Sequence, residues 1–95
     1  VSLVDFKFNT KKAISVEELN KKFQEYANGP LKGIMGVDTD PKVSSDYNHD
    51  SRSSILDLTE TTAVSDNFGR VLTWYDNEWG FSNRMLETTE QVCKL

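Results

Sequence analysis

With 95 residues and a formal net charge of -4, the chain has the size of one small domain, which buries roughly 60 to 70% of its unfolded surface in a single core. The acidic balance argues against nucleic acid and against an anionic membrane surface as partners, because binding to either needs a basic face. No apolar run approaches the roughly 20 residues that span a bilayer, and a single cysteine excludes an internal disulfide and favours a reducing compartment such as the cytoplasm.

The first predicted element is a strand. Val4, Phe6 and Phe8 alternate with polar residues, and this period of two predicts a half-buried strand of the antiparallel type with one solvated face. The sequence begins without methionine and inside this strand. We therefore expect it to be a piece of a longer protein.

A helix is predicted next. Ser15 and, three residues later, Glu18 form a capping box, which is a frequent helix start. Apolar residues then recur at helical spacing as far as Ala27. Gly29 and Pro30 end the helix, because glycine tolerates the left-handed cap conformation and proline cannot continue the hydrogen-bonding pattern.

Three further strands are predicted in the middle of the chain. Leu31 to Val37 is short and apolar, and its two glycines, Gly33 and Gly36, indicate a close approach of backbone. Ser54 to Val64 is rich in strand-forming residues, and Arg70 to Tyr75 returns after a turn. These two longer segments predict a β-hairpin.

A closing helix is predicted after the hairpin. Its apolar or small residues fall near one face: Phe81, Met85, Thr88, Thr89, Val92 and Cys93. The order strand, helix, strand, hairpin, helix predicts an α+β fold with a mainly antiparallel sheet. Residues 1–95 contain no repeat and no linker.

Cys93 and His49 are the only thiol and the only imidazole, so a cysteine-histidine nucleophilic pair is the first enzyme hypothesis. On the apolar side of a helix, however, Cys93 is more often a small buried hydrophobic residue with a raised pKa. His49 lies in a run of polar turn formers, which more often make a loop than orient a general base. The residues by themselves favour a structural role for both.

Neither a metal site nor a phosphate site is indicated. Asp46, His49 and Asp50 offer one nitrogen and two carboxylates, but they lack the recurrent spacing of a metal-binding motif. No glycine-rich phosphate-binding motif and no G-x-S-x-G motif occurs. Any bound nucleotide must be held mainly by residues outside this sequence.

The stretch Trp74 to Arg84, W-Y-D-N-E-W-G-F-S-N-R, gathers four aromatic rings around an expected turn. Such rings face the domain's own core, a partner chain or a flat ligand. Asn77 lies between the strand and the closing helix, so its carboxamide could pair with another flat amide, flanked by the rings of Tyr75 and Phe81. From the pattern alone, a helix cap with packed tryptophans is the better supported interpretation.

The same stretch resembles the segment near the C-terminus of glyceraldehyde-3-phosphate dehydrogenases. Other segments are similar to this family in order and spacing along all 95 residues, among them Val1 to Asp5, Gly29 to Ile34 and Val43 to Tyr47. The resemblance implies that residues 1–95 are the C-terminal part of the catalytic domain of a two-domain enzyme. The Rossmann domain, which holds NAD in this family, is absent from the sequence.

The resemblance also implies an activity. In this family a cysteine thiolate attacks an aldehyde, a hydride passes to the nicotinamide of NAD, and inorganic phosphate releases the thioester as an acyl phosphate in glycolysis. The expected substrate is thus a phosphorylated aldehyde. The expected assembly is a homotetramer formed through a face of this sheet, in the cytoplasm, without nucleic acid or membrane.

Three cofactor-binding residues carry over from the family. Asn77 matches the asparagine that holds the nicotinamide carboxamide, and Tyr75 matches an aromatic residue close to the reactive cysteine. Phe81 stands where the family usually has a tyrosine beside the nicotinamide, so only the packing role of that ring remains. The family's nucleophilic cysteine and its histidine have no counterpart, because Cys93 and His49 do not align with them. We expect no catalytic residue and no metal ligand here, and the chain alone should be inactive.

Two other hypotheses remain open. The sister enzyme erythrose-4-phosphate dehydrogenase resembles this chain at Asn48 to Asp50 and at Asn77 to Phe81, whereas Trp74 to Asp76 and Val43 to Asp46 resemble glyceraldehyde-3-phosphate dehydrogenase more. The third hypothesis is an inactive fragment that acts only as a folding or interaction module. The missing catalytic pair and the missing Rossmann motif support it.

Overall fold

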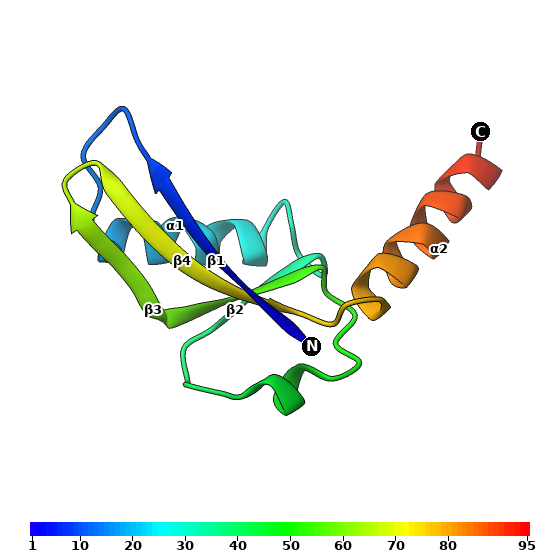
Figure 1. Ribbon diagram of the computed structural model, residues 1–95. Helices are drawn as coiled ribbons and strands as arrows, with labels where there is room; N and C mark the ends of the chain where they lie inside the picture. The colour runs from blue at the N-terminus through cyan, green and yellow to red at the C-terminus, as the bar shows by residue number, and fades with distance from the viewer.

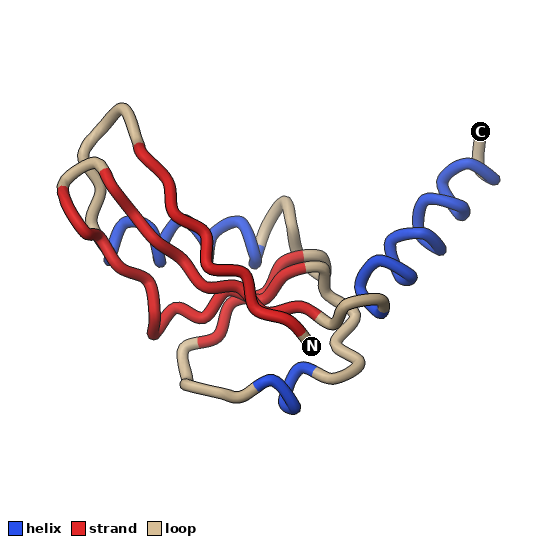
Figure 2. Tube along the Cα trace, in the orientation of Figure 1, coloured by secondary structure: helices blue, strands red, loops and turns tan.

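The computed structural model describes all of residues 1–95. In chain order its elements are β1 (Ser2–Asn9), α1 (Val16–Asn28), β2 (Met35–Asp38), the 3-10 helix η1 (Ser44–Tyr47), β3 (Ser54–Ser65), β4 (Phe68–Tyr75) and α2 (Trp79–Cys93). The strands form one sheet, with α1 behind it in the view of Figure 1, whereas α2 leaves the sheet and ends free (Figures 1 and 2). Neither helix has the length and apolarity that a membrane span requires.

The sheet has the strand order β1-β4-β3-β2. β4 pairs in antiparallel fashion with β1 on one side and with β3 on the other, so the predicted hairpin of β3 and β4 is present. β2 pairs with β3 in parallel, because the segment that contains η1 returns the chain to the end of the sheet from which β2 starts. The prediction of an α+β fold with a mainly antiparallel sheet is confirmed.

The core lies between α1 and one face of the sheet. Leu56 and Leu58 of β3 and Val71 of β4 are buried there, and Phe23 of α1 packs against them. Because these side chains come from positions of like parity on neighbouring strands, they share one face of the sheet. This face is where β3, β4 and α1 hold one another in place.

The opposite face is covered by η1. Tyr47 is 2% exposed, and its ring stacks on the ring of Trp74, with centroids 5.5 Å apart. Its hydroxyl donates to Oδ2 of Asp38 at 2.9 Å. Burial, followed by this hydrogen bond to a carboxylate, raises the pKa of Tyr47 above its ordinary value, because both favour the neutral phenol.

The ends of α1 agree only in part with the prediction. Ser15 is the N-cap, and its hydroxyl accepts the backbone N–H of Glu18 at 3.2 Å. Gly29, however, is not left-handed, since its φ is -123°. The helix ends differently because the N–H of Leu31 returns to the Tyr26 carbonyl at 2.9 Å, which satisfies that carbonyl without a left-handed residue.

The strand predicted from Leu31 to Val37 starts later in the structure than the sequence pattern indicates. Residues 31–34 form turns, in which the N–H groups of Ile34 and Met35 both donate to the Leu31 carbonyl, so the strand begins only at Met35. Gly33 has a φ of 82° and no close neighbour, whereas a Cβ at Gly36 would lie 2.0 Å from the Arg52 guanidinium. A close approach is therefore found at Gly36 alone, and the approaching group is the Arg52 side chain rather than backbone.

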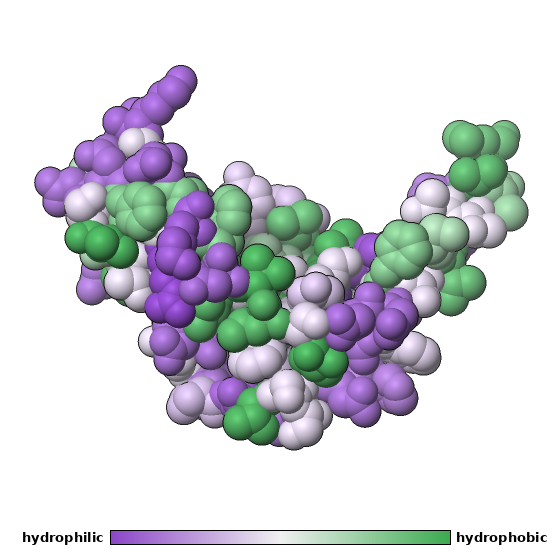
Figure 3. Space-filling view, in the orientation of Figure 1, coloured by the Kyte–Doolittle hydropathy of each residue, from purple (hydrophilic) through white to green (hydrophobic).

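Two apolar surfaces of the chain are exposed, one on β1 and one on α2. Phe6 in β1 is 54% exposed and Val4 is 41% exposed, because α1 covers only part of its face of the sheet. The apolar side of α2 is uncovered, and Cys93 is exposed rather than buried, because no strand or helix packs along α2. Figure 3 shows apolar surface both over the middle of the sheet and along α2.

Candidate functional site

Asn77 lies in the short turn between β4 and α2. Its Nδ2 donates to the Ser2 hydroxyl at 2.6 Å, and Ser2 pairs with Tyr75 in the ladder between β1 and β4. The Asn77 carboxamide is therefore held against the first residue of β1, while its Oδ1 accepts no hydrogen bond from the protein. Because an amide oxygen can accept two hydrogen bonds, this oxygen is open to a donor on a ligand.

The other two predicted cofactor-binding residues flank this turn. Tyr75 is the last residue of β4 and is partly exposed. Phe81 lies in the first turn of α2, and 68% of it is exposed. Tyr75 and Asn77 thus both meet Ser2, whereas Phe81 is carried by the neighbouring helix with its ring toward solvent.

Asp76 is a residue that the sequence interpretation missed. Its Oδ1 accepts the backbone N–H groups of Glu78 at 3.3 Å and Trp79 at 3.1 Å, and its Oδ2 accepts that of His49 at 3.0 Å. The N–H of His49, and after it that of Trp79, lowers the pKa of this carboxyl, because both stabilise the charged form. An aspartate shortly before a helix is a common capping signal, but the cap was assigned to Asn77, whose side chain instead reaches Ser2.

The first turn of α2 is attached to the loop before β3. His49 in that loop has a φ of 62°, and its ring lies over Trp79 with centroids 5.0 Å apart. A Cβ at Gly80 would lie 2.7 Å from the Arg52 carbonyl oxygen, so backbone meets backbone here. One turn further on, Arg84 donates to the Ser53 hydroxyl at 3.1 Å.

Cys93 and His49 are too far apart to form a nucleophilic pair. His49 contacts Trp79 at the start of α2, and Cys93 is the last residue of that helix. A rise of about 1.5 Å per residue puts roughly 20 Å of helix between the two ends. His49 also belongs to no group of three metal-binding side chains, and Asp50 is occupied by a bidentate ion pair with Arg52.

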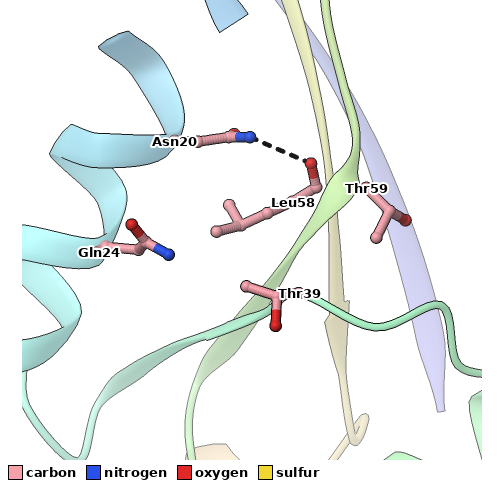
Figure 4. Close-up of a pocket in the computed structure, with 5 residues that line it drawn as sticks. All are labelled: Asn20, Gln24, Thr39, Leu58 and Thr59. Atoms are coloured by element: carbon pink, nitrogen blue, oxygen red, sulfur yellow. Dashed lines mark hydrogen bonds between the residues drawn. The ribbon is translucent and has the colours of Figure 1, made fainter. Parts of the chain in front are cut away.

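The largest cavity, of about 310 Å³, lies away from this turn, between α1 and β3. It is lined by Asn20, Gln24, Thr39, Leu58 and Thr59 (Figure 4). Asn20 donates from its Nδ2 to the Leu58 carbonyl at 3.2 Å, which fastens α1 to the strand. With only one apolar residue in its lining, this cavity lacks the apolar walls of most small-molecule sites.

Comparison with known proteins identifies the family of this chain. Residues 1–77 match the model of a family of dehydrogenase C-terminal domains, described as "Glyceraldehyde 3-phosphate dehydrogenase, C-terminal domain". The chain belongs to this glyceraldehyde-3-phosphate dehydrogenase family, and the resemblance seen in the sequence is confirmed.

Individual relatives match over nearly the whole chain. Glyceraldehyde-3-phosphate dehydrogenases of Cereibacter sphaeroides and Xanthobacter flavus are 46% and 47% identical over 95 residues, which is 100% of this chain. A protein of Sinapis alba named as the cytosolic form of the enzyme is 45% identical over 94 residues, or 99% of this chain. The chain spans 28% of the length of each of these relatives.

Proposed function

We propose that residues 1–95 form the C-terminal part of the catalytic domain of a phosphorylating, NAD-dependent glyceraldehyde-3-phosphate dehydrogenase. The observation that carries the assignment of the site is the state of the Asn77 carboxamide. One N–H is anchored on Ser2 at 2.6 Å, and the oxygen accepts nothing from the protein. The oxygen of such an amide can accept a hydrogen bond from the N–H of another carboxamide. In the glyceraldehyde-3-phosphate dehydrogenase family, the cofactor NAD carries such a group on its nicotinamide ring.

We propose that this chain contributes contacts only to the nicotinamide end of NAD. Asn77 would accept from the carboxamide, and the exposed ring of Phe81 with that of Tyr75 would provide apolar contact on either side. NAD supplies the hydride acceptor of the reaction. The phosphates and the adenosine need a second domain, because these 95 residues contain no glycine-rich phosphate-binding turn.

The chain by itself is proposed to be inactive. Its one cysteine and its one histidine are separated by the length of α2, so the two cannot act together on one substrate. We propose that the complete enzyme acts in the cytoplasm as a homotetramer on a phosphorylated aldehyde. The cytosolic name of the Sinapis alba relative and the uncovered apolar surface of this chain support that proposal.

The test is Asn77→Ala in the protein in which this segment is joined to its nucleotide-binding part. A neutral hydrogen bond contributes about 0.5 to 1.5 kcal/mol, so the Kd of NAD should rise about 2- to 12-fold, and hydride transfer should slow. Titration of NAD by calorimetry and stopped-flow detection of NADH measure the two effects. Asn28→Ala, at the exposed end of α1, is the control. Unchanged NAD affinity and rate in Asn77→Ala would contradict the proposal.

A further inference from the structure

Asp76 joins three parts of the molecule through its two carboxylate oxygens. Oδ1 accepts the N–H groups of Glu78 and Trp79 where α2 begins, and Oδ2 accepts the N–H of His49 from the loop before β3. Asn77 lies between Asp76, which accepts these hydrogen bonds, and Glu78 and Trp79, whose N–H groups donate two of them. Its own carboxamide is then directed to Ser2.

We propose that Asp76 is a positioning residue for Asn77, and that its carboxylate holds the turn in the one conformation that presents the Asn77 oxygen to the nicotinamide. This inference rests on the proposed function. The inference adds Asp76 to the proposed site as a residue that contacts neither cofactor nor substrate and acts through Asn77.

The chemistry of the contact requires a carboxylate. Two acceptor oxygens serve two separate segments, and an asparagine has only one acceptor oxygen. Asp76→Asn therefore keeps either the helix start or the tie to His49, but not both. The negative charge also lies at the N-terminus of α2, where it interacts favourably with the helix dipole.

The tie to His49 is supported by the packing around it. The His49 backbone has a positive φ of 62°, which is uncommon for a residue other than glycine and needs local stabilisation. The Asp76 bond and the contact of the imidazole with Trp79 at 5.0 Å supply it. When the tie is lost, the loop and the turn no longer constrain each other, so Asn77 should sample other orientations.

The experiment is a double-mutant cycle on Asp76 and Asn77 in the protein that contains the nucleotide-binding part. We expect Asp76→Asn to raise the Kd of NAD about 2- to 12-fold, and to have no further effect when Asn77 is already alanine. Hydrogen exchange of the His49 and Trp79 amides, followed without NAD, should accelerate at one or both positions. Asp66→Asn, at the exposed turn of the hairpin, is the charge-matched control and should change none of these quantities.

A second variant guards against a general loss of structure. Asp76→Ser retains a side chain that caps helices well but cannot reach two segments, so α2 should stay folded by circular dichroism while NAD binding weakens as in Asp76→Asn. If Asn77→Ala weakens NAD binding but both Asp76 variants bind NAD normally, the positioning role is overturned and the proposed function stands. Additive effects in the double mutant would also overturn it. If Asn77→Ala itself binds NAD normally, the proposed function fails, and this inference fails with it.

Discussion

Gly80 shows how a single residue determines where α2 starts. Its Cα faces the Arg52 backbone so closely that an added Cβ would lie 2.7 Å from the carbonyl oxygen and 3.3 Å from the carbonyl carbon. These are main-chain atoms, which cannot move aside like the end of a flexible side chain. The position therefore requires glycine for a tertiary reason, although glycine is unfavourable within a helix.

Gly80→Ala tests this contact because two effects predict opposite signs. Helix propensity alone would stabilise the protein by about 1 kcal/mol, whereas the clash should destabilise it by about 1 to 3 kcal/mol. We expect net destabilisation, measured as a lower midpoint in urea unfolding. Ser82→Ala, exposed in the same turn, should stay within about 0.5 kcal/mol of the parent. A more stable Gly80→Ala variant would show that α2 is not seated on Arg52.

Titration of Tyr47 should make the free energy of unfolding depend on pH in the alkaline range. Burial and the hydrogen bond to Asp38 raise its pKa in the folded state. A group with a raised folded pKa stabilises the fold fully below its unfolded pKa, and loses that contribution as the pH rises through the folded value. The unfolding free energy should therefore decline above pH about 10, the ordinary value for tyrosine.

Tyr47→Phe isolates that contribution. It removes the hydroxyl donor to Asp38, so the free energy of unfolding at neutral pH should fall by about 1 kcal/mol, and the alkaline decline should become shallower. Urea unfolding followed between neutral and alkaline pH measures both. Tyr26 is 47% exposed, so Tyr26→Phe is the matched control and should leave the profile unchanged. An identical alkaline profile in Tyr47→Phe and the parent would contradict the assignment.

At the scale of elements, the helices differ in how they are held. α1 packs on the sheet through Phe23 and is fastened to β3 by the bond from Asn20 to the Leu58 carbonyl. α2 is held only at its start, by its contacts with the loop of residues 49–53. The remainder of α2 extends from the body (Figure 1), so its apolar side needs a covering surface that these residues do not provide.

The two edges of the sheet also differ. β2 is short, whereas β1 is a long edge strand with Phe6 and Val4 exposed on it. Such an edge offers unpaired N–H and C=O groups beside apolar side chains, which favours pairing with a further strand. We expect β1 and α2 to contribute surface through which this segment meets the rest of an enzyme.

For the whole molecule, the small core has a direct consequence. Only 13 of 95 residues are buried, and large apolar side chains of β1 and α2 are exposed, which favours association between copies of the chain. We expect it to self-associate, as measured by light scattering at increasing concentration. Phe6→Lys should reduce this association, because charge on an edge strand opposes strand pairing. Val64→Lys, at the far end of β3, is the control. A monodisperse parent chain would contradict the expectation.

Local sequence patterns predicted most elements correctly. The hairpin of β3 and β4, the start of α1 at Ser15 and the α+β class follow from side-chain period and capping chemistry, which act over a few residues. The stretch around Asn77 was recognised for the same reason, since its residues are adjacent in the chain. The family assignment depends on such stretches and is confirmed by residues 1–77.

Contacts between distant residues were decided only by the tertiary structure. The bond from Asn77 to Ser2 spans 75 positions and that from Asp76 to His49 spans 27, so no local pattern announces either. The parallel pairing of β2, the glycine requirement at Gly80 and the exposure of Cys93 likewise depend on which segments meet and which surfaces stay uncovered. The sequence determines elements through short-range preferences, whereas the orientation of a site depends on packing between elements, which only the folded chain defines.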